Sequence, residues 1–108
     1  EVEEVETLAD SLGGGIGLEN RLTFAMCRAL RDDVVLLTED EIAAGIRHAY
    51  EEEREVIEGA AAVGIGAILA GKVRSQGPIV ALLTGRNIDM ALHRRVVCGE
   101  PTGMERAA

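Results

Sequence analysis

Apolar residues along this chain follow two patterns: helical spacing in some segments and uninterrupted runs in others. Positions 22, 25, 26, 29 and 30 are apolar and lie three or four residues apart, which predicts a helix from about Asn20 to Arg31. Two short runs, Val34–Leu37 and Ile79–Leu83, are apolar at every position. Such runs are typical of strands that are buried on both faces of a sheet.

Between the two predicted strands, the pattern indicates two helices of different character. The segment Thr38–Glu41 is a capping box, in which the Thr38 hydroxyl accepts from the Glu41 amide while the Glu41 carboxylate reaches back. An amphipathic helix is predicted to follow over residues 42–54. The next helix, over about 58–70, has no polar face, and a helix that is apolar all round is usually buried. A last helix is predicted over about 88–97.

This order of elements predicts an α/β fold with a mostly parallel sheet flanked by helices. The composition agrees, because 47% of the 108 residues are hydrophobic but only 2% are aromatic, so the core must consist of Ala, Val, Ile and Leu. The length suits one domain. The longest apolar stretch, residues 59–71, is shorter than the roughly 18–20 residues that cross a bilayer. We therefore expect no membrane partner.

Charge and cysteine content narrow the function classes. The formal net charge is -8 and the sequence pI is about 4.7, which argues against a nucleic-acid partner because affinity for the phosphate backbone comes from Lys and Arg. Cys27 and Cys98 stand far apart, with no CxxC or Cys/His cluster around them. The sequence thus predicts neither a zinc site nor a disulfide framework, and reduced thiols favour a cytoplasmic location.

The glycine-rich run Ser11–Asn20 suggests one alternative function. A dinucleotide fingerprint needs GxGxxG between an apolar strand and a helix. Gly13 and Gly15 fit the first pair, but Leu18 occupies the place of the third glycine, and the preceding segment carries acids where a buried strand would be apolar. A stand-alone nucleotide-binding or interaction module that uses the loop 13–17 is therefore the second hypothesis.

Candidate site residues follow from the predicted topology. Ligands of parallel α/β sheets lie beyond the carboxyl ends of the strands, which selects residues 38–40 and 84–87. Thr38 already serves as a helix cap, whereas the Thr84 hydroxyl, followed by Gly85 and then Asn87, has no such structural task. Glu58 opens the apolar helix, where the helix dipole stabilises a carboxylate. A structural and a functional role for Glu58 both remain open.

Together these motifs resemble the C-terminal part of the pyridoxal-phosphate enzymes of fold type II. The nearest group comprises the threonine dehydratases and serine racemase, and the resemblance covers residues 5–93. It is carried, in order, by "ETLADS", "LTF", "DDVVLLTEDEI", "EREVIEGAAAVGIGAILAGKV" and "IVALLTGRNID". The glycine loop and "YEEEREVIEGA" are most similar to the hydroxyectoine-utilisation dehydratases. The resemblance implies that residues 1–97 are the C-terminal portion of the large cofactor-binding domain and that 98–108 form a tail.

The resemblance also implies a cofactor, pyridoxal 5'-phosphate, and roles for particular residues. Thr84 corresponds to the hydroxyl residue that meets the pyridine nitrogen, and Gly85 and Asn87 to the turn that positions it. Glu58 corresponds to the acid beside the cofactor ring, and Ser11 to a glycine whose backbone lies along the cofactor. The residues that fall on the substrate side are Gly13, Gly14 and Gly15.

The activity implied is dehydration of a β-hydroxy amino acid, threonine or serine, to a 2-oxo acid and ammonia. A neutral hydroxyl at the ring nitrogen does not enforce protonation there, which suits elimination. Arg86 and Ser11 each replace a glycine of the family pattern, and the only lysine, Lys72, does not match the Schiff-base lysine. We therefore expect that lysine to lie upstream, no catalytic residue and no metal ligand in this segment, and a homodimer completed by the missing N-terminal part.

Overall fold

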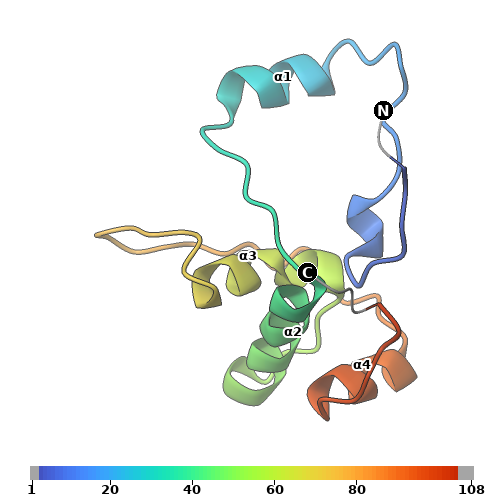
Figure 1. Ribbon diagram of the computed structural model, residues 1–108. Helices are drawn as coiled ribbons and strands as arrows, with labels where there is room; N and C mark the ends of the chain where they lie inside the picture. Colours follow the sequence, from blue (N-terminus) through green and yellow to red (C-terminus); the bar gives the residue numbers. More distant parts are fainter. Residues whose placement is uncertain (1–2, 105–108) are drawn as a thin grey trace.

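The computed structural model describes residues 3–104, and helices provide the regular structure in this range (Figure 1). Three of the helices, together with the N-terminal segment, form one packed cluster. A fourth helix stands away from that cluster on extended connections, and all of its residues are exposed (Figure 1). The elements are η1 (Asp10–Leu12), α1 (Thr23–Leu30), α2 (Glu39–Glu53), α3 (Gly59–Leu69) and α4 (Met90–Val97).

All four predicted helices are present, with ends within about three residues of the expected ones. The capping box is confirmed: the Glu41 amide donates to the Thr38 hydroxyl at 3.2 Å, and the Thr38 amide donates to the Glu41 carboxylate at 2.9 Å. At the end of α3, Gly71 adopts a left-handed φ of 71°, and the Lys72 amide donates back to the Ala67 carbonyl at 3.0 Å. This Schellman ending explains why α3 stops before a glycine.

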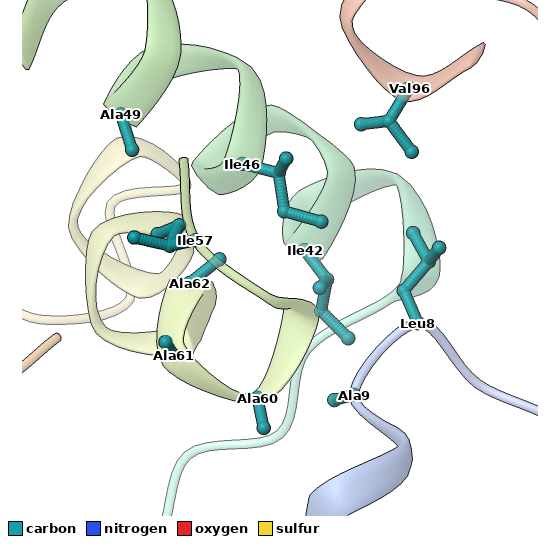
Figure 2. Close-up of a cluster of buried hydrophobic side chains, with 10 residues drawn as sticks. All are labelled: Leu8, Ala9, Ile42, Ile46, Ala49, Ile57, Ala60, Ala61, Ala62 and Val96. Atoms are coloured by element: carbon teal, nitrogen blue, oxygen red, sulfur yellow. The ribbon is translucent and has the colours of Figure 1, made fainter. Parts of the chain in front are cut away.

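The core lies where α2, α3 and α4 meet the N-terminal segment. Small alanines on α3 allow the longer side chains of α2 to pack closely, so few aromatic residues are needed. Figure 2 shows the members of this cluster: Leu8, Ala9, Ile42, Ile46, Ala49, Ile57, Ala60, Ala61, Ala62 and Val96. The expectation that α3 is buried all round is wrong for its last turn, since Ile68 and Leu69 are 36% and 50% exposed.

Glycines bring the backbones of α2 and α3 into direct contact. A Cβ added at Gly45 would lie 2.5 Å from the Ala62 carbonyl oxygen, and one added at Gly66 would lie 2.6 Å from the Glu41 carbonyl oxygen. No side chain fits at either position without moving a helix. The glycines that weaken α3 by helix propensity therefore serve, at Gly66, a close helix–helix crossing.

The two predicted strands are not formed in residues 3–104, and the parallel sheet is not confirmed. Residues 34–37 and 79–83 belong to no regular element, and Leu36 and Val80 are 81% and 91% exposed. A strand is stabilised by hydrogen bonds to a neighbouring strand, and the described residues contain no such ladder. The apolar side chains of these two runs are suited to burial, but several of them are exposed.

Candidate functional site

Glu58 occupies the N-cap of α3 and is buried, with 9% of its surface exposed. Its carboxylate oxygen Oε2 accepts a hydrogen bond from the backbone N–H of Asn87 at 2.8 Å. Its own amide donates to the Gly85 carbonyl at 3.2 Å. Two hydrogen bonds, one from the side chain and one from the backbone, thus join the start of α3 to the turn at 85–87.

Gly85 allows the Glu58 carboxylate to lie against this turn. A Cβ at Gly85 would lie 2.8 Å from Oε2 of Glu58 and 3.0 Å from its Cδ. Any side chain larger than hydrogen would therefore displace the carboxylate or the turn. The structure brings together three residues that the sequence singled out separately: Glu58, Gly85 and Asn87.

Thr84 precedes this turn and is exposed, and in the described part of the chain its hydroxyl has no hydrogen-bond partner. The Arg86 Nε donates to the Val56 carbonyl at 3.3 Å. The arginine that replaces a glycine of the family pattern thus ties the turn to the segment that leads into Glu58. The hydroxyl of Thr84 stays available for a ligand.

Ser11 lies in η1 and is exposed, just after two buried residues of the core. The Leu8 carbonyl rests so close to Gly59 that a Cβ on Gly59 would overlap it. Ser11 is therefore held near the start of α3 through Leu8. Neither Gly59 nor Leu8 was singled out from the sequence, although Gly59 directly follows Glu58 in the "EGA" segment.

The predicted substrate-side glycines line an open hollow between the N-terminal arm and the glycine loop. Its lining consists of residues 3–7, 9, 10, 12–18 and Met104. Glu58 and the 84–87 turn are not among these lining residues, so the structure does not join the glycine loop and Thr84 in one hollow. Gly14 and Gly17 adopt φ values of 103° and 85°, which only glycine adopts readily.

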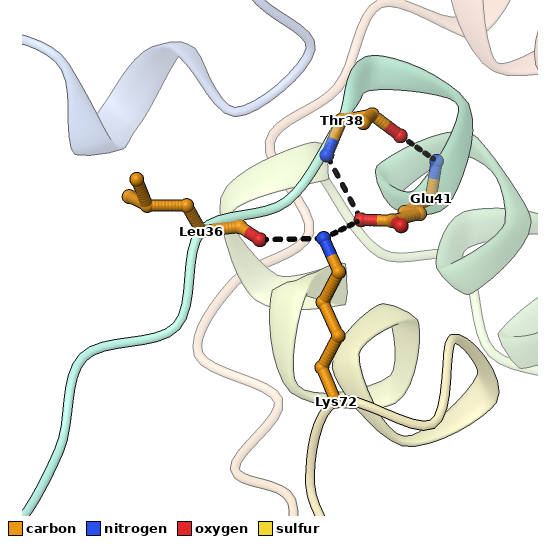
Figure 3. A network of polar contacts seen from close by, with 4 residues as sticks. All are labelled: Leu36, Thr38, Glu41 and Lys72. Carbon is orange, nitrogen blue, oxygen red and sulfur yellow. Dashed lines mark hydrogen bonds and ion pairs between the residues drawn. The ribbon is translucent and has the colours of Figure 1, made fainter.

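Lys72 lies at the opposite end of α3 from Glu58, about 16 Å away along the helix axis. Its Nζ forms an ion pair with Glu41 at 2.7 Å and donates to the Leu36 carbonyl at 2.8 Å (Figure 3). The hydrogen bond from Lys72, followed by the one from the Thr38 amide, lowers the pKa of Glu41 below its usual 4.5. Lys72 therefore fastens the end of α3 to the start of α2 and is remote from Glu58.

Comparison with known proteins identifies the family of this chain. Residues 1–85 match the family described as "Pyridoxal-phosphate dependent enzyme". The chain belongs to this pyridoxal-phosphate-dependent family. Membership implies a domain of fold type II, the class suggested by the ordered sequence motifs. No solved structure matches the chain significantly.

Several relatives of this family member carry the name threonine dehydratase or ammonia-lyase. A "Putative threonine dehydratase" of Sinorhizobium fredii is 64% identical over 100 residues, which is 92% of this chain and 30% of the relative. The "L-threonine ammonia-lyase" of Thermotoga maritima is 36% identical over 97 residues, covering 89% of this chain and 23% of the relative. Human "Serine racemase" is 35% identical over 89 residues, 79% of this chain and 25% of the relative. The chain thus spans less than a third of the length of these curated relatives.

The residues around Glu58 have the chemistry that one edge of a pyridoxal ring requires. The carboxylate is buried and already fixed by Asn87, while the neighbouring Thr84 hydroxyl is exposed without a partner in residues 3–104. A hydroxyl of this kind can meet a ring nitrogen, and the glycine at 85 lets the Glu58 carboxylate lie directly beside it. The residues that would hold the cofactor here are Thr84, Gly85, Asn87 and Glu58.

Other site types gain no support from the described residues. A dinucleotide fold would need a strand before the glycine loop, but residues 3–7 form none and α1 begins only at Thr23. No three His, Cys, Asp or Glu side chains gather there where they could hold a metal ion. Cys27 and Cys98 are both free and exposed. None of the described helices is both long and apolar enough to cross a membrane.

Proposed function

We propose that this chain forms part of the cofactor site of a pyridoxal-phosphate-dependent dehydratase or ammonia-lyase. The substrate class is a β-hydroxy amino acid, threonine or serine, and the products are a 2-oxo acid and ammonia. The observation that carries the proposal is the union of the buried Glu58 with the turn of Gly85 and Asn87, directly beside the unpartnered Thr84 hydroxyl. The names of the relatives support the reaction class.

The proposal gives each of these residues a physical task. Bound pyridoxal phosphate withdraws electrons from the α-carbon of the amino acid, so the protein must orient the ring and limit its charge. The Thr84 hydroxyl is neutral and does not hold a proton on the ring nitrogen as an Asp would. Glu58 keeps the 85–87 turn in place. Ser11 and the loop 13–15 would lie on the side from which the amino acid enters.

We further propose that the rest of the protein covers the two extended apolar segments of this chain. Residues 34–37 and 79–83 expose large apolar side chains and belong to no regular element. Strands added beside them would satisfy their backbone groups and bury these side chains, completing the expected sheet. The Schiff-base lysine is proposed to come from that part of the protein, because Lys72 is engaged with Glu41 far from Glu58.

The finer assignments rest on the resemblance. We propose a cytoplasmic homodimer, and within the substrate class an intermediate of hydroxyectoine breakdown as the natural amino acid. The glycine loop and the segment "YEEEREVIEGA" favour that subgroup. A substrate screen that compares threonine, serine and hydroxyectoine-derived amino acids distinguishes among them by kcat/KM.

The test uses the full-length protein. It should purify with the visible absorbance of bound pyridoxal phosphate and release 2-oxo acid from threonine or serine. Thr84→Ala should lower kcat by about two- to tenfold, and lower the affinity for the cofactor less, because it removes one neutral hydrogen bond of about 0.5–1.5 kcal/mol to the ring. Ser75→Ala, which removes an exposed hydroxyl that accepts the Gly77 amide at 3.1 Å in another loop, is the control.

Two results would contradict the proposal. A protein that carries the cofactor but forms no 2-oxo acid from any β-hydroxy amino acid would exclude the reaction. Unchanged turnover in Thr84→Ala, with Ser75→Ala also unchanged, would show that Thr84 does not meet the ring.

A further inference from the structure

Glu39 holds the segment that leads into the glycine loop. Its carboxylate oxygen Oε2 accepts the Leu8 amide at 2.8 Å, although the two residues are 31 positions apart. Glu39 is the first residue of α2, and Leu8 is 5% exposed. The bond therefore connects the start of α2 to a buried point of the N-terminal segment.

The carbonyl group of Leu8 faces α3. The Leu8 carbonyl rests against Gly59, at a spacing that no Cβ would allow, and Gly59 follows Glu58 directly. Figure 2 shows Leu8 and Ala9 on one side of the core cluster, next to Ile42 of α2 and Ala60 of α3. The amide and the carbonyl of Leu8 are thus fixed by the N-terminal ends of two different helices.

Leu8 is connected to the glycine loop through η1. The Leu12 amide donates to the Ala9 carbonyl at 3.0 Å, and the Gly13 amide donates to the Asp10 carbonyl at 2.9 Å. These short-range bonds make η1 a stiff link between Leu8 and Gly13. A shift at Leu8 must therefore move the loop 13–15 relative to Glu58.

We propose that Glu39 is a positioning residue that sets the place of the glycine loop 13–15 relative to Glu58, and thereby the KM for the amino acid. The inference rests on the proposed function. A carboxylate acceptor makes a stronger hydrogen bond than a neutral group, which suits the task of holding a loop. Glu39 does not contact the proposed cofactor turn, so its effect falls on substrate binding.

The experiment compares variants of the full-length holoenzyme at Glu39 with a control at Asp40. Glu39→Ala and Asp40→Ala each remove one acid from the first turn of α2, so both lose a similar interaction with the helix dipole. Only Glu39→Ala also loses the acceptor for Leu8. Glu39→Gln keeps an acceptor oxygen at the same reach, and Glu39→Asp keeps the charge on a side chain that is one methylene shorter.

Three readouts are expected to separate these variants. In Glu39→Ala, the amide hydrogens of Leu8 and Gly13 should exchange with solvent about tenfold faster, and the KM for threonine or serine should rise about tenfold, as expected for loss of a hydrogen bond to a charged group. The kcat at saturation and the cofactor absorbance should change little. Glu39→Gln, which keeps a neutral acceptor, should fall between the parent protein and Glu39→Ala. Asp40→Ala should behave as the parent protein does.

Several outcomes would overturn the inference. These are unchanged exchange at Leu8 and Gly13 in Glu39→Ala, an equal change in Asp40→Ala, or damage in Glu39→Gln as large as in Glu39→Ala. Should Glu39→Ala fail to fold, Glu39→Asp carries the same expectation of faster exchange and higher KM. A parent protein without activity would defeat the proposed function alone, because amide exchange still decides whether Glu39 fixes the loop.

Discussion

Gly66→Ala is expected to destabilise the protein, whereas Gly64→Ala, two residues away in α3, is not. Both changes replace a glycine inside a helix and so gain about 1 kcal/mol of helix propensity. They differ in what the new methyl group meets. At Gly66 the nearest atom is the Glu41 carbonyl oxygen in the backbone of α2, at 2.6 Å, while at Gly64 it is the Cβ of Ala81, at 3.3 Å.

The size of the effect follows from these distances. Ordinary van der Waals contact begins at 3.4 Å, so the methyl group at position 66 requires α2 and α3 to separate by about 0.8 Å. A gap of that size forfeits about a quarter to a half of the dispersion attraction of each contact across the interface. Overpacking costs about 1–3 kcal/mol, so after the helix-propensity gain of about 1 kcal/mol we expect a net loss of up to about 2 kcal/mol.

At position 64 a shift of about 0.1 Å relieves the contact, and Gly64→Ala should leave stability unchanged or raise it by up to about 1 kcal/mol. The assay is denaturant unfolding of the full-length protein, followed by circular dichroism, with the midpoint and slope compared among variants. Gly45→Ala tests the same crossing from the side of α2 and should also destabilise. If Gly66→Ala were as stable as Gly64→Ala, the close approach of the two helix backbones would be refuted.

Two further changes test the site and the core. Gly85→Ala would place a methyl group 2.8 Å from the Glu58 carboxylate and displace it from the Asn87 backbone N–H. That hydrogen bond is worth about 1.5–3 kcal/mol, so its loss should weaken pyridoxal-phosphate affinity about 10–100-fold in an equilibrium titration. Gly77→Ala, where a Cβ meets nothing within 4 Å, is the control, and equal affinities in both variants would contradict the arrangement. His93 is 6% exposed, its Nε2 has no partner in residues 3–104, and burial lowers its pKa below the usual 6.5. As pH falls, His93 of the unfolded chain is protonated before His93 of the folded protein, so stability should decline below about pH 6.5. His93→Leu should flatten the decline in Tm between about pH 7 and 5. An equal decline in both proteins would contradict this role of His93.

The helices could be predicted because their signals are local. The capping box at Thr38 and the apolar spacing within α2 act over one or two turns, so the residues that define them are neighbours in sequence. The two apolar runs, 34–37 and 79–83, were predicted to be strands, but they form no sheet within residues 3–104. A strand exists only when it pairs with another, and no sequence window contains that partner.

The candidate site was predicted only in part. The sequence singled out Glu58, Gly85 and Asn87 by their motifs, but the hydrogen bonds that unite them span 27–29 positions and required the structure. The bond between Glu39 and Leu8 had no sequence signal at all. An acid at the first position of a helix is common for electrostatic reasons, which hides any tertiary task that it performs.

By itself, the sequence determined the four helices, the small-residue core and the family, because periodicity, capping and ordered motifs are properties of neighbouring residues. Only the tertiary structure decided which backbones touch. It alone showed that Gly66 and Gly59 are contact points, that Lys72 is engaged with Glu41, and that Leu8 is fixed between two helices. These facts depend on distances between residues far apart in the chain, and a linear pattern carries no information about such distances.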